Sequence, residues 1–507
     1  MPNSSAATLI EALEQRCAVD VPWLTFHHGA SVFRASTGTV RQLARGWAAA
    51  FTRAGVQPGD RVGLWQPNSI DFVAAFFGAL GAGAIAVPLA WPVAESATDQ
   101  GLDRLAPLLR QAGIRHLAMP EGVADARRIS GPEAPGRALR SGEPGDAAFI
   151  QFTSGSTQTP RGAVINHRAA LCNATALVNA LGASSRDVGV SWLPLFHDMG
   201  LVGVLLTSLL GGFELHLLRP AEFLLHPKRW LELCGEVQAT LTVAPDFGYA
   251  YAARRVPADA QLSLSSLRIA LTGSEPIQQR TLDAFSARFG PSGFRPEAFH
   301  GAYGLAENTL AVAIGPALEA SYTTSSGRVV PTVGRAVGDV EIAIDAREGE
   351  EGPIRVRSGS LMSGYFGAPE ATAEVLRDGW LHTGDRGVRR DGRLFVTGRD
   401  KDLVIKAGRK FHPSEIEQVV ASCVDTTPNG VAAFSIASRG DGEELVVVVE
   451  PRRVASEASE HAVKTAVVTE LGVRVDRVEW VAPGALPRTS SGKLKRSECV
   501  RLFGGPR

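Results

Sequence analysis

The chain has 507 residues, more than a single hydrophobic core usually organises, so we expect several structural units. Lys and Arg number 52, as do Asp and Glu, which leaves no net field to attract nucleic acid or an anionic membrane and favours a small-molecule enzyme. The five cysteines are scattered without metal-ligand or redox spacing, which argues against a disulfide framework and indicates a reducing cytoplasm.

An apolar stretch at residues 72–90 is uncharged and about as long as a minimal membrane span. It contains Gly78, Gly81, Gly83 and Pro88, which divide it into a short helix, a turn and an apolar strand. We therefore expect a buried helix-to-strand unit and no membrane span. The N-terminal residues also lack the basic and apolar regions of a secretory signal.

Through most of the chain, helical patterns alternate with short apolar runs such as RVGLW, IAVPL and SLRIALTG. This alternation predicts an α/β fold in which mostly parallel sheets are covered by helices. From Ile342 onward the runs become short strands separated by Gly and Asp turn signals, so we expect a β-rich subdomain that closes the large unit.

A second unit is expected after the polar cluster at residues 398–402. A helix near Pro413, a strand at 444–450 and a further helix near Ala462 follow this cluster. About a hundred residues are enough for a small independent domain. We predict a large N-terminal domain at 1–398 and a small α+β domain at 399–507.

The stretch FIQFTSGSTQTPRGA places small hydroxyl residues around a glycine after an apolar run, with a cation close by. Backbone N–H and side-chain O–H groups of such a loop can converge on phosphate oxygens. Taken alone, the stretch fits a Ser/Thr-rich surface turn equally well. It lacks the Gly-Lys-Ser/Thr ending of a Walker-type loop, which argues against a P-loop ATPase. The residues predicted to hold the nucleotide phosphates are Thr153, Ser154, Gly155, Ser156, Thr157 and Arg161.

Further motifs occur along the chain in the order GDRVGLWQPNSIDFVAAFFGALGAGAIAVPL, WLPLFHDMGL, TGSEPI, YGLAE, HTGDRG, GRDKDLVIKAGRK and LPRTSSGKLKR. Together with the hydroxyl-rich loop, they resemble the adenylate-forming superfamily. Within it, WLPLFHDMGLVG and YGLAENTL resemble fatty acyl-AMP ligases. The resemblance implies that ATP, with Mg²⁺, and a carboxylic acid give acyl-AMP and pyrophosphate. It also implies transfer of the acyl group to the phosphopantetheine thiol of an acyl carrier protein in trans, with CoA as the second choice.

The motif YGLAE carries two candidate nucleotide contacts. The ring of Tyr303 can stack on adenine, and Glu307 can supply an oxygen ligand for Mg²⁺ that bridges the phosphates. Without that context, a packed ring and a solvated charge are the more common outcome for such residues. The resemblance further implies that the backbone of Ser274, Glu275 and Pro276 lies along adenine. It also implies that Asp385 binds the ribose hydroxyls and that Arg399 lies near the ribose and phosphate.

Lys493 in TSSGKLKR lies on a Gly-containing loop, where most lysines are exposed charges. The resemblance identifies it with the catalytic lysine that contacts the reacting carboxylate and phosphate. It also implies that the domain at 1–398 is the adenylating domain and that the domain at 399–507 is a mobile lid carrying this lysine. Lys401 would be the hinge of the lid, and Gly408 would lie beside the tunnel for the thiol. His197 in PLFHDMG resembles a residue that gates thiol entry at the mouth of the acyl pocket, and a hydrogen-bonded structural role fits it equally.

The acyl pocket is expected to include Asp246, Phe247 and Gly301. Asp246 stands where fatty acyl-AMP ligases often have Asn, so its carboxylate can pair with an amino or hydroxyl group of the substrate. The phosphate loop also departs from the family, with Gln158 where Gly is usual and Arg161 where Lys is usual.

The stretch 311–338 is shorter than the insertion that restrains the lid in fatty acyl-AMP ligases, so the choice between carrier protein and CoA stays open. The alternatives are an acyl-CoA or aryl-CoA ligase and a stand-alone amino acid adenylation enzyme. An ATP or GTP phosphohydrolase and an inactive homologue that binds nucleotide or acyl groups are two further classes. Carboxylate-dependent exchange of pyrophosphate into ATP distinguishes an adenylating enzyme from both.

Overall fold

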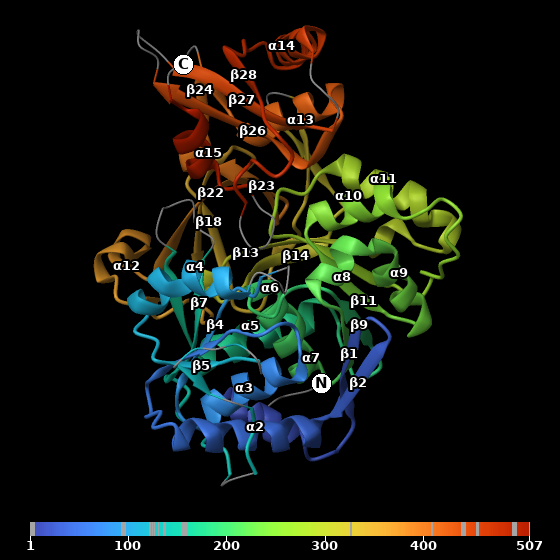
Figure 1. The fold of residues 1–507 in the computed structure, drawn as a ribbon. Helices are drawn as coiled ribbons and strands as arrows, with labels where there is room; N and C mark the ends of the chain where they lie inside the picture. Colours follow the sequence, from blue (N-terminus) through green and yellow to red (C-terminus); the bar gives the residue numbers. More distant parts are fainter. Residues whose placement is uncertain are drawn as a thin grey trace.

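The computed structural model describes residues 6–92, 98–120, 123, 125, 127–129, 131–134, 138–153, 160–324, 327–406, 409–437, 443–452, 456–488 and 494–505. Figure 1 shows a large body built from most of these residues and a smaller C-terminal region above it, drawn in orange and red.

The larger sheet of the described chain is mostly parallel. From one edge to the other its strands are β17 (Arg335–Ala336), β14 (Ala311–Pro316), β13 (Phe299–Gly304), β12 (Ile269–Thr272), β11 (Leu241–Ala244), β9 (Val188–Ser191), β10 (Glu214–Leu217), β1 (Pro22–His28) and β2 (Ser31–Ser36). Neighbours from β13 to β1 pair in parallel, whereas β17, β14 and β2 are antiparallel additions at the edges. The carboxyl ends of β12 and β13 therefore lie side by side.

A second sheet of the large body combines parallel and antiparallel strands. Its order is β20 (Gly364–Tyr365), β8 (Gly162–Asn166), β7 (Ala147–Phe152), β4 (Ile85–Pro88), β3 (Arg61–Leu64), β5 (His116–Ala118) and β6 (Arg128–Ile129). An antiparallel sheet follows in the chain, with β18 (Glu341–Ile344), β19 (Gly352–Arg357), β22 (Trp380–Arg390), β21 (Leu376–Arg377) and β23 (Arg393–Arg399). The predicted α/β fold with mostly parallel sheets and a β-rich region is confirmed.

Helices surround these sheets (Figure 1). In the large body they are α1 (Leu9–Arg16), α2 (Thr37–Arg53), α3 (Ile70–Gly81), α4 (Thr98–Gln111), α5 (His167–Ala180), α6 (Asp198–Gly200), α7 (Thr207–Gly211), α8 (Pro220–Leu225), α9 (Pro227–Glu236), α10 (Asp246–Arg255), α11 (Gln279–Phe289) and α12 (Pro369–Val375). A π-helix, η2 (Leu201–Leu206), joins α6 to α7.

Helix α3 and strand β4 form the apolar stretch that resembled a membrane span. The side chain of Ser69 caps α3 by accepting a backbone N–H of its first turn at 3.2 Å, and Gly83, with φ of +80°, turns the chain toward β4. Gly78 lets α3 pack closely on α2, because a Cβ there would lie 2.5 Å from the Cβ of Trp47. The predicted helix-to-strand unit is confirmed. No helix among the described residues is long and apolar enough to cross a bilayer.

The C-terminal region has a hydrophobic core of its own, with buried Ile416, Val447 and Val463 among its members. This core supports the proposed division into domains at 1–398 and 399–507. The elements of the region are β24 (Val404–Lys406), β25 (Arg409–Phe411), α13 (Pro413–Cys423), β26 (Thr426–Ala437), β27 (Glu443–Pro451), α14 (Glu457–Leu471), β28 (Arg477–Trp480) and α15 (Arg496–Phe503).

Polar contacts tie α13 to the large body. Within the stretch 311–338, β15 (Ser321–Thr323) and β16 (Val329–Pro331) form a hairpin, from which Arg328 Nη1 donates to Ser414 Oγ at 2.7 Å. His412 Nε2 lies 2.8 Å from Glu351 Oε1, next to β19. The hairpin and the β-rich sheet therefore hold α13 in the orientation seen here.

The buried side chain of His167 should make the stability of the fold depend on pH. His167 is 4% exposed, begins α5, and accepts a hydrogen bond at Nδ1 from the backbone N–H of Leu9 at 3.2 Å. Burial lowers the pKa of His167 to about 4, although Asp146 and Glu11 oppose the shift. Between pH about 6.5 and 4 the unfolded chain binds the extra proton, so the free energy of unfolding falls as the pH decreases through this range.

We expect this single group to cost roughly 2 kcal/mol of stability between pH 7 and pH 5. Urea unfolding at both values measures the loss. In the variant His167→Asn, whose amide oxygen can replace the acceptor but does not titrate, the difference between pH 7 and pH 5 should shrink by that amount. An unchanged difference would show that His167 is not the group responsible.

Candidate active site

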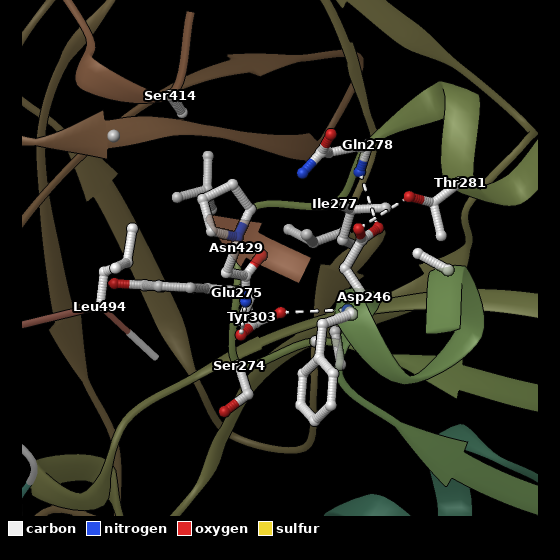
Figure 2. Close-up of a pocket in the computed structure, with 18 of the residues that line it drawn as sticks. Asp246, Ser274, Glu275, Ile277, Gln278, Thr281, Tyr303, Ser414, Asn429 and Leu494 are labelled. Atoms are coloured by element: carbon white, nitrogen blue, oxygen red, sulfur yellow. Dashed lines mark hydrogen bonds between the residues drawn. The ribbon is translucent and has the colours of Figure 1, made fainter. Parts of the chain in front are cut away.

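A cavity of about 1180 Å³ lies between the carboxyl ends of β12 and β13, the β-rich sheet and the C-terminal region. Figure 2 shows part of its lining, to which α10, the loop after β12, β13 and the C-terminal region all contribute. Most of the residues predicted to bind the nucleotide are found here.

The loop after β12 is held in place by Asp246, the first residue of α10. Its carboxylate is 3% exposed, and its two oxygens accept from the backbone N–H of Gln278 at 2.9 Å and from Thr281 Oγ1 at 2.8 Å (Figure 2). Burial raises the pKa of Asp246 to about 7. Gly273 allows the loop to approach β13, because a Cβ there would lie 2.6 Å from the carbonyl oxygen of Ala302. Asp246 therefore positions the loop that contains the predicted adenine contacts.

Ser274, Glu275 and Pro276 all line the cavity. Ser274 has a φ of +71°, a strained conformation for a residue with a side chain, which is often found at functional sites. The Glu275 carboxylate accepts from the backbone N–H of Phe247 at 3.2 Å and from Asn429 Nδ2 at 3.5 Å. Asn429 belongs to β26, so this loop contacts the C-terminal region directly.

Tyr303, Asp385 and Arg399 form one hydrogen-bonded group on the cavity wall. The Tyr303 hydroxyl donates to Asp385 Oδ2 at 2.7 Å, and Arg399 Nε donates to Asp385 Oδ1 at 2.9 Å. Asp385 is 5% exposed, and its negative charge raises the pKa of Arg399. Asp385 and Arg399 face each other in the register of β22 and β23, which explains why these distant positions meet.

Glu307 is held by a residue that the sequence analysis did not single out. Its carboxylate lines the cavity, and its Oε1 accepts from the Tyr365 hydroxyl at 2.6 Å. The guanidinium carbon of Arg161 lies 5.3 Å from the centre of the Tyr365 ring. Tyr365 therefore links the predicted metal ligand to the predicted phosphate cation. Its position depends on the pairing of β20 with β8, where Tyr365 faces Ala163.

His197 lines the cavity beside the π-helix η2. Its Nδ1 lies 2.7 Å from Asp198 Oδ1 and 3.3 Å from the backbone nitrogen of Met199, at the start of α6. These contacts fit the structural role considered for His197, while its place in the lining fits the gating role. Among the described residues, π-helices occur only at η2, next to a cavity wall, and such helices are frequent at functional sites.

Part of the lining of the cavity is apolar. Phe247 belongs to its lining, whereas Gly301 does not, because Gly301 faces the carbonyl oxygen of Thr332 and its neighbour Ala302 lines the cavity instead. Other apolar residues of the lining are Leu177, Met199, Val243, Leu271, Leu310 and Ile314.

Several predicted residues lie outside the described part of the chain: Ser154, Gly155, Ser156, Thr157, Gln158, Gly408 and Lys493. Their neighbours are described. The backbone N–H of Thr153 donates to the carbonyl oxygen of Arg161 at 2.8 Å, and Leu494 lines the cavity. Lys401 is exposed in a short 3-10 helix at Asp400–Asp402, directly after Arg399, and its role as a hinge stays a prediction.

Comparison with known proteins identifies the family to which this chain belongs. A family model described as AMP-binding enzyme matches residues 18–366. The chain belongs to the AMP-binding enzyme family. This AMP-binding enzyme is 35% identical to a putative acyl-CoA synthetase from Caulobacter vibrioides, over 89% of this chain and 86% of that protein. It is 31% identical to a medium-chain-fatty-acid–acyl-carrier-protein ligase from Moorena producens, over 88% of this chain and 86% of that one.

A solved structure from work on fatty acyl-adenylate ligases of E. coli and L. pneumophila superimposes with a TM-score of 0.90. It is 31% identical in sequence, and the match covers 99% of this chain and 98% of that one. The resemblance to the adenylate-forming superfamily is therefore confirmed. This AMP-binding enzyme is an acyl-AMP ligase that uses ATP to adenylate an acyl group.

Proposed function

We propose that the substrate is a fatty acid and that its acyl group passes from AMP to the phosphopantetheine thiol of a separate acyl carrier protein. The observation that carries the fatty acid is the apolar part of the cavity lining, in the same cavity as the group of Tyr303, Asp385 and Arg399. A long hydrocarbon chain gains about 0.8 kcal/mol for each CH₂ buried in such a place. The carrier protein is supported by the relative from Moorena producens, whose name includes that acceptor.

An amino acid substrate has less support. In the sequence, Asp246 is the carboxylate that can pair with an amino group of the acid. In the structure both of its oxygens accept from protein donors, Gln278 and Thr281, so an ammonium group would have to compete with these bonds.

The proposed chemistry has two steps. A carboxylate oxygen of the acid attacks the α-phosphorus of ATP, the bond to the β-phosphate oxygen breaks, and pyrophosphate leaves. The thiolate sulfur then attacks the acyl carbon, the bond to the phosphate oxygen breaks, and AMP leaves. Asp385 and Arg399 would hold the ribose, while Arg161 and Lys493 would offset the repulsion between the two anions of the first step.

Mg²⁺ fits Glu307. The described residues contain no group of three metal-ligating side chains, and Mg²⁺ commonly binds one or two carboxylates together with phosphate oxygens and water. Burial raises the pKa of Glu307, so this carboxylate would gain from a cation beside it. Bound there, Mg²⁺ would supply positive charge to the phosphates.

Pyrophosphate exchange into ATP, measured with a panel of fatty, aryl and amino acids, tests the proposed substrate. We expect exchange to depend on the acid and to be fastest with a fatty acid. Transfer is then followed with holo acyl carrier protein and with CoA as separate acceptors. Exchange that responds only to amino acids would overturn the proposal for the acid, and transfer to CoA alone would overturn the proposal for the acceptor.

The hydroxyl of Tyr365 should matter for adenylation, because it orients the carboxylate of Glu307. A hydrogen bond to a charged group contributes about 1.5–3 kcal/mol, so Tyr365→Phe should lower the exchange rate by about tenfold or more. The Mg²⁺ concentration for half-maximal exchange should rise as well. Tyr322→Phe, on the hairpin β15–β16, is the matched control and should leave both values unchanged. Equal behaviour of the two variants would contradict the positioning role.

A further inference from the structure

An irregularity in strand β26 brings Asn429, a residue of the C-terminal region, to the wall of the cavity. The pairing of β26 with β27 shifts register between Thr426 and Val431, and Asn429, within this bulge, has a φ of +51°. The next residue, Gly430, packs so closely that a Cβ there would lie 2.4 Å from Thr427 Oγ1. Bulges redirect side chains and are frequent next to active sites. Here the bulge makes Asn429 part of the cavity lining.

The backbone of this bulge is fixed from inside the C-terminal region. Glu450, on β27, is 1% exposed, and its Oε2 accepts from Thr427 Oγ1 at 2.7 Å and from Arg488 Nη2 at 2.7 Å. Arg488 Nη2 also donates to the carbonyl oxygen of Asn429 at 3.0 Å. Hydrogen bonds that involve charged groups are the stronger ones, and these hold the bulge at two points. The side chain of Asn429 therefore projects from a braced turn.

Asn429 meets the loop that is predicted to lie along adenine. Its Nδ2 donates to Glu275 Oε1 at 3.5 Å, and the carboxylate of Glu275 is itself held by the backbone N–H of Phe247 (Figure 2). Ser274, the preceding residue of this loop, also has a positive φ, so two strained turns from different domains border the same part of the cavity. A base held along this loop would lie beside the amide of Asn429.

We infer that the side chain of Asn429 binds the edge of the adenine base and helps the enzyme to select ATP. This inference rests on the predicted adenine contacts of Ser274, Glu275 and Pro276. A primary amide has a donor and an acceptor side by side, and adenine presents its N6 amino group beside the acceptor N7, so the two can form a pair of hydrogen bonds. Guanine has an oxygen in place of that amino group, so the amide could satisfy only one of its two acceptors.

The test compares ATP with purine riboside triphosphate, which is ATP without the N6 amino group, in pyrophosphate exchange by the full-length enzyme. Asn429→Gly removes the side chain and keeps the backbone conformation, because glycine adopts a positive φ readily. We expect this variant to raise the KM for ATP about tenfold, with little change in kcat. The KM for the purine nucleotide, already higher in the unsubstituted enzyme, should rise much less, so that the preference for ATP shrinks.

Ser414→Ala is the matched control, because it removes a different contact between the C-terminal region and the large body, the hydrogen bond from Arg328. It should change the KM for both nucleotides by the same factor. If Asn429→Gly also changed both by one factor, or changed neither, the inference would be overturned and Asn429 would serve only to join the domains. The comparison uses whichever acid supports exchange, so its outcome is independent of the proposed fatty acid and of the proposed acceptor.

Discussion

Replacing Lys493 by alanine is expected to lower carboxylate-dependent pyrophosphate exchange by about a hundredfold or more, as the loss of one preorganised charge partner does in other enzymes. The first step brings a carboxylate against a triphosphate, so a cation at this point stabilises the transition state more than the separate substrates. Lys493 is proposed for this role by its motif, and the adjoining residue Leu494 lines the cavity. The exchange rate at saturating ATP and acid measures the effect.

Two comparisons distinguish this role from a general loss of structure. Lys464→Ala removes another lysine of the C-terminal region, one that pairs with Glu460 at 2.7 Å, and should leave the exchange rate unchanged. Transfer from acyl-AMP supplied directly should also be little affected by Lys493→Ala, because that step does not bring two anions together at phosphorus. If exchange persisted in Lys493→Ala, another cation would have to serve this role.

The sequence predicts the elements of this fold well, because each one is encoded locally. The helix-to-strand unit around Gly78 and Gly83 follows from apolar residues and glycines that are neighbours in the chain. The motif residues Tyr303, Asp385 and Arg399 are also identified from the sequence, through their resemblance to a family. That they share hydrogen bonds is a finding of the structure.

The contacts that local patterns missed depend on long-range pairing. Tyr365 reaches Glu307 only because β20 pairs with β8, and Asn429 meets Glu275 only because β26 packs beside the loop after β12. Neither residue stands in a motif with a recognisable spacing. The two oxygens of Asp246 likewise have partners that lie in another helix and loop, so its sequence environment suggested a substrate contact rather than a structural one.

Asp385→Ala is expected to raise the KM for ATP by roughly a hundredfold with a much smaller change in kcat. A carboxylate has about four acceptor positions, so Asp385 can accept from the ribose hydroxyls in addition to Tyr303 and Arg399. Each hydrogen bond to a charged group contributes about 1.5–3 kcal/mol, and the ribose does not react. Its contacts are therefore the same in the ground state and the transition state, which places their loss in KM.

Tyr303→Phe is the companion variant, because it removes the hydroxyl that donates to Asp385 and keeps the ring proposed to stack on adenine. It should raise the KM for ATP only a few-fold, since stacking is retained. Asp385→Ala leaves the buried Tyr303 hydroxyl without its acceptor, which should lower the stability of the variant by about 1–3 kcal/mol. The unfolding of this variant must therefore be measured first, and the kinetics recorded under conditions in which the variant is folded. Should kcat and kcat/KM fall equally in Asp385→Ala, the carboxylate would be acting on the transition state, as proposed for Lys493, and not on ribose binding.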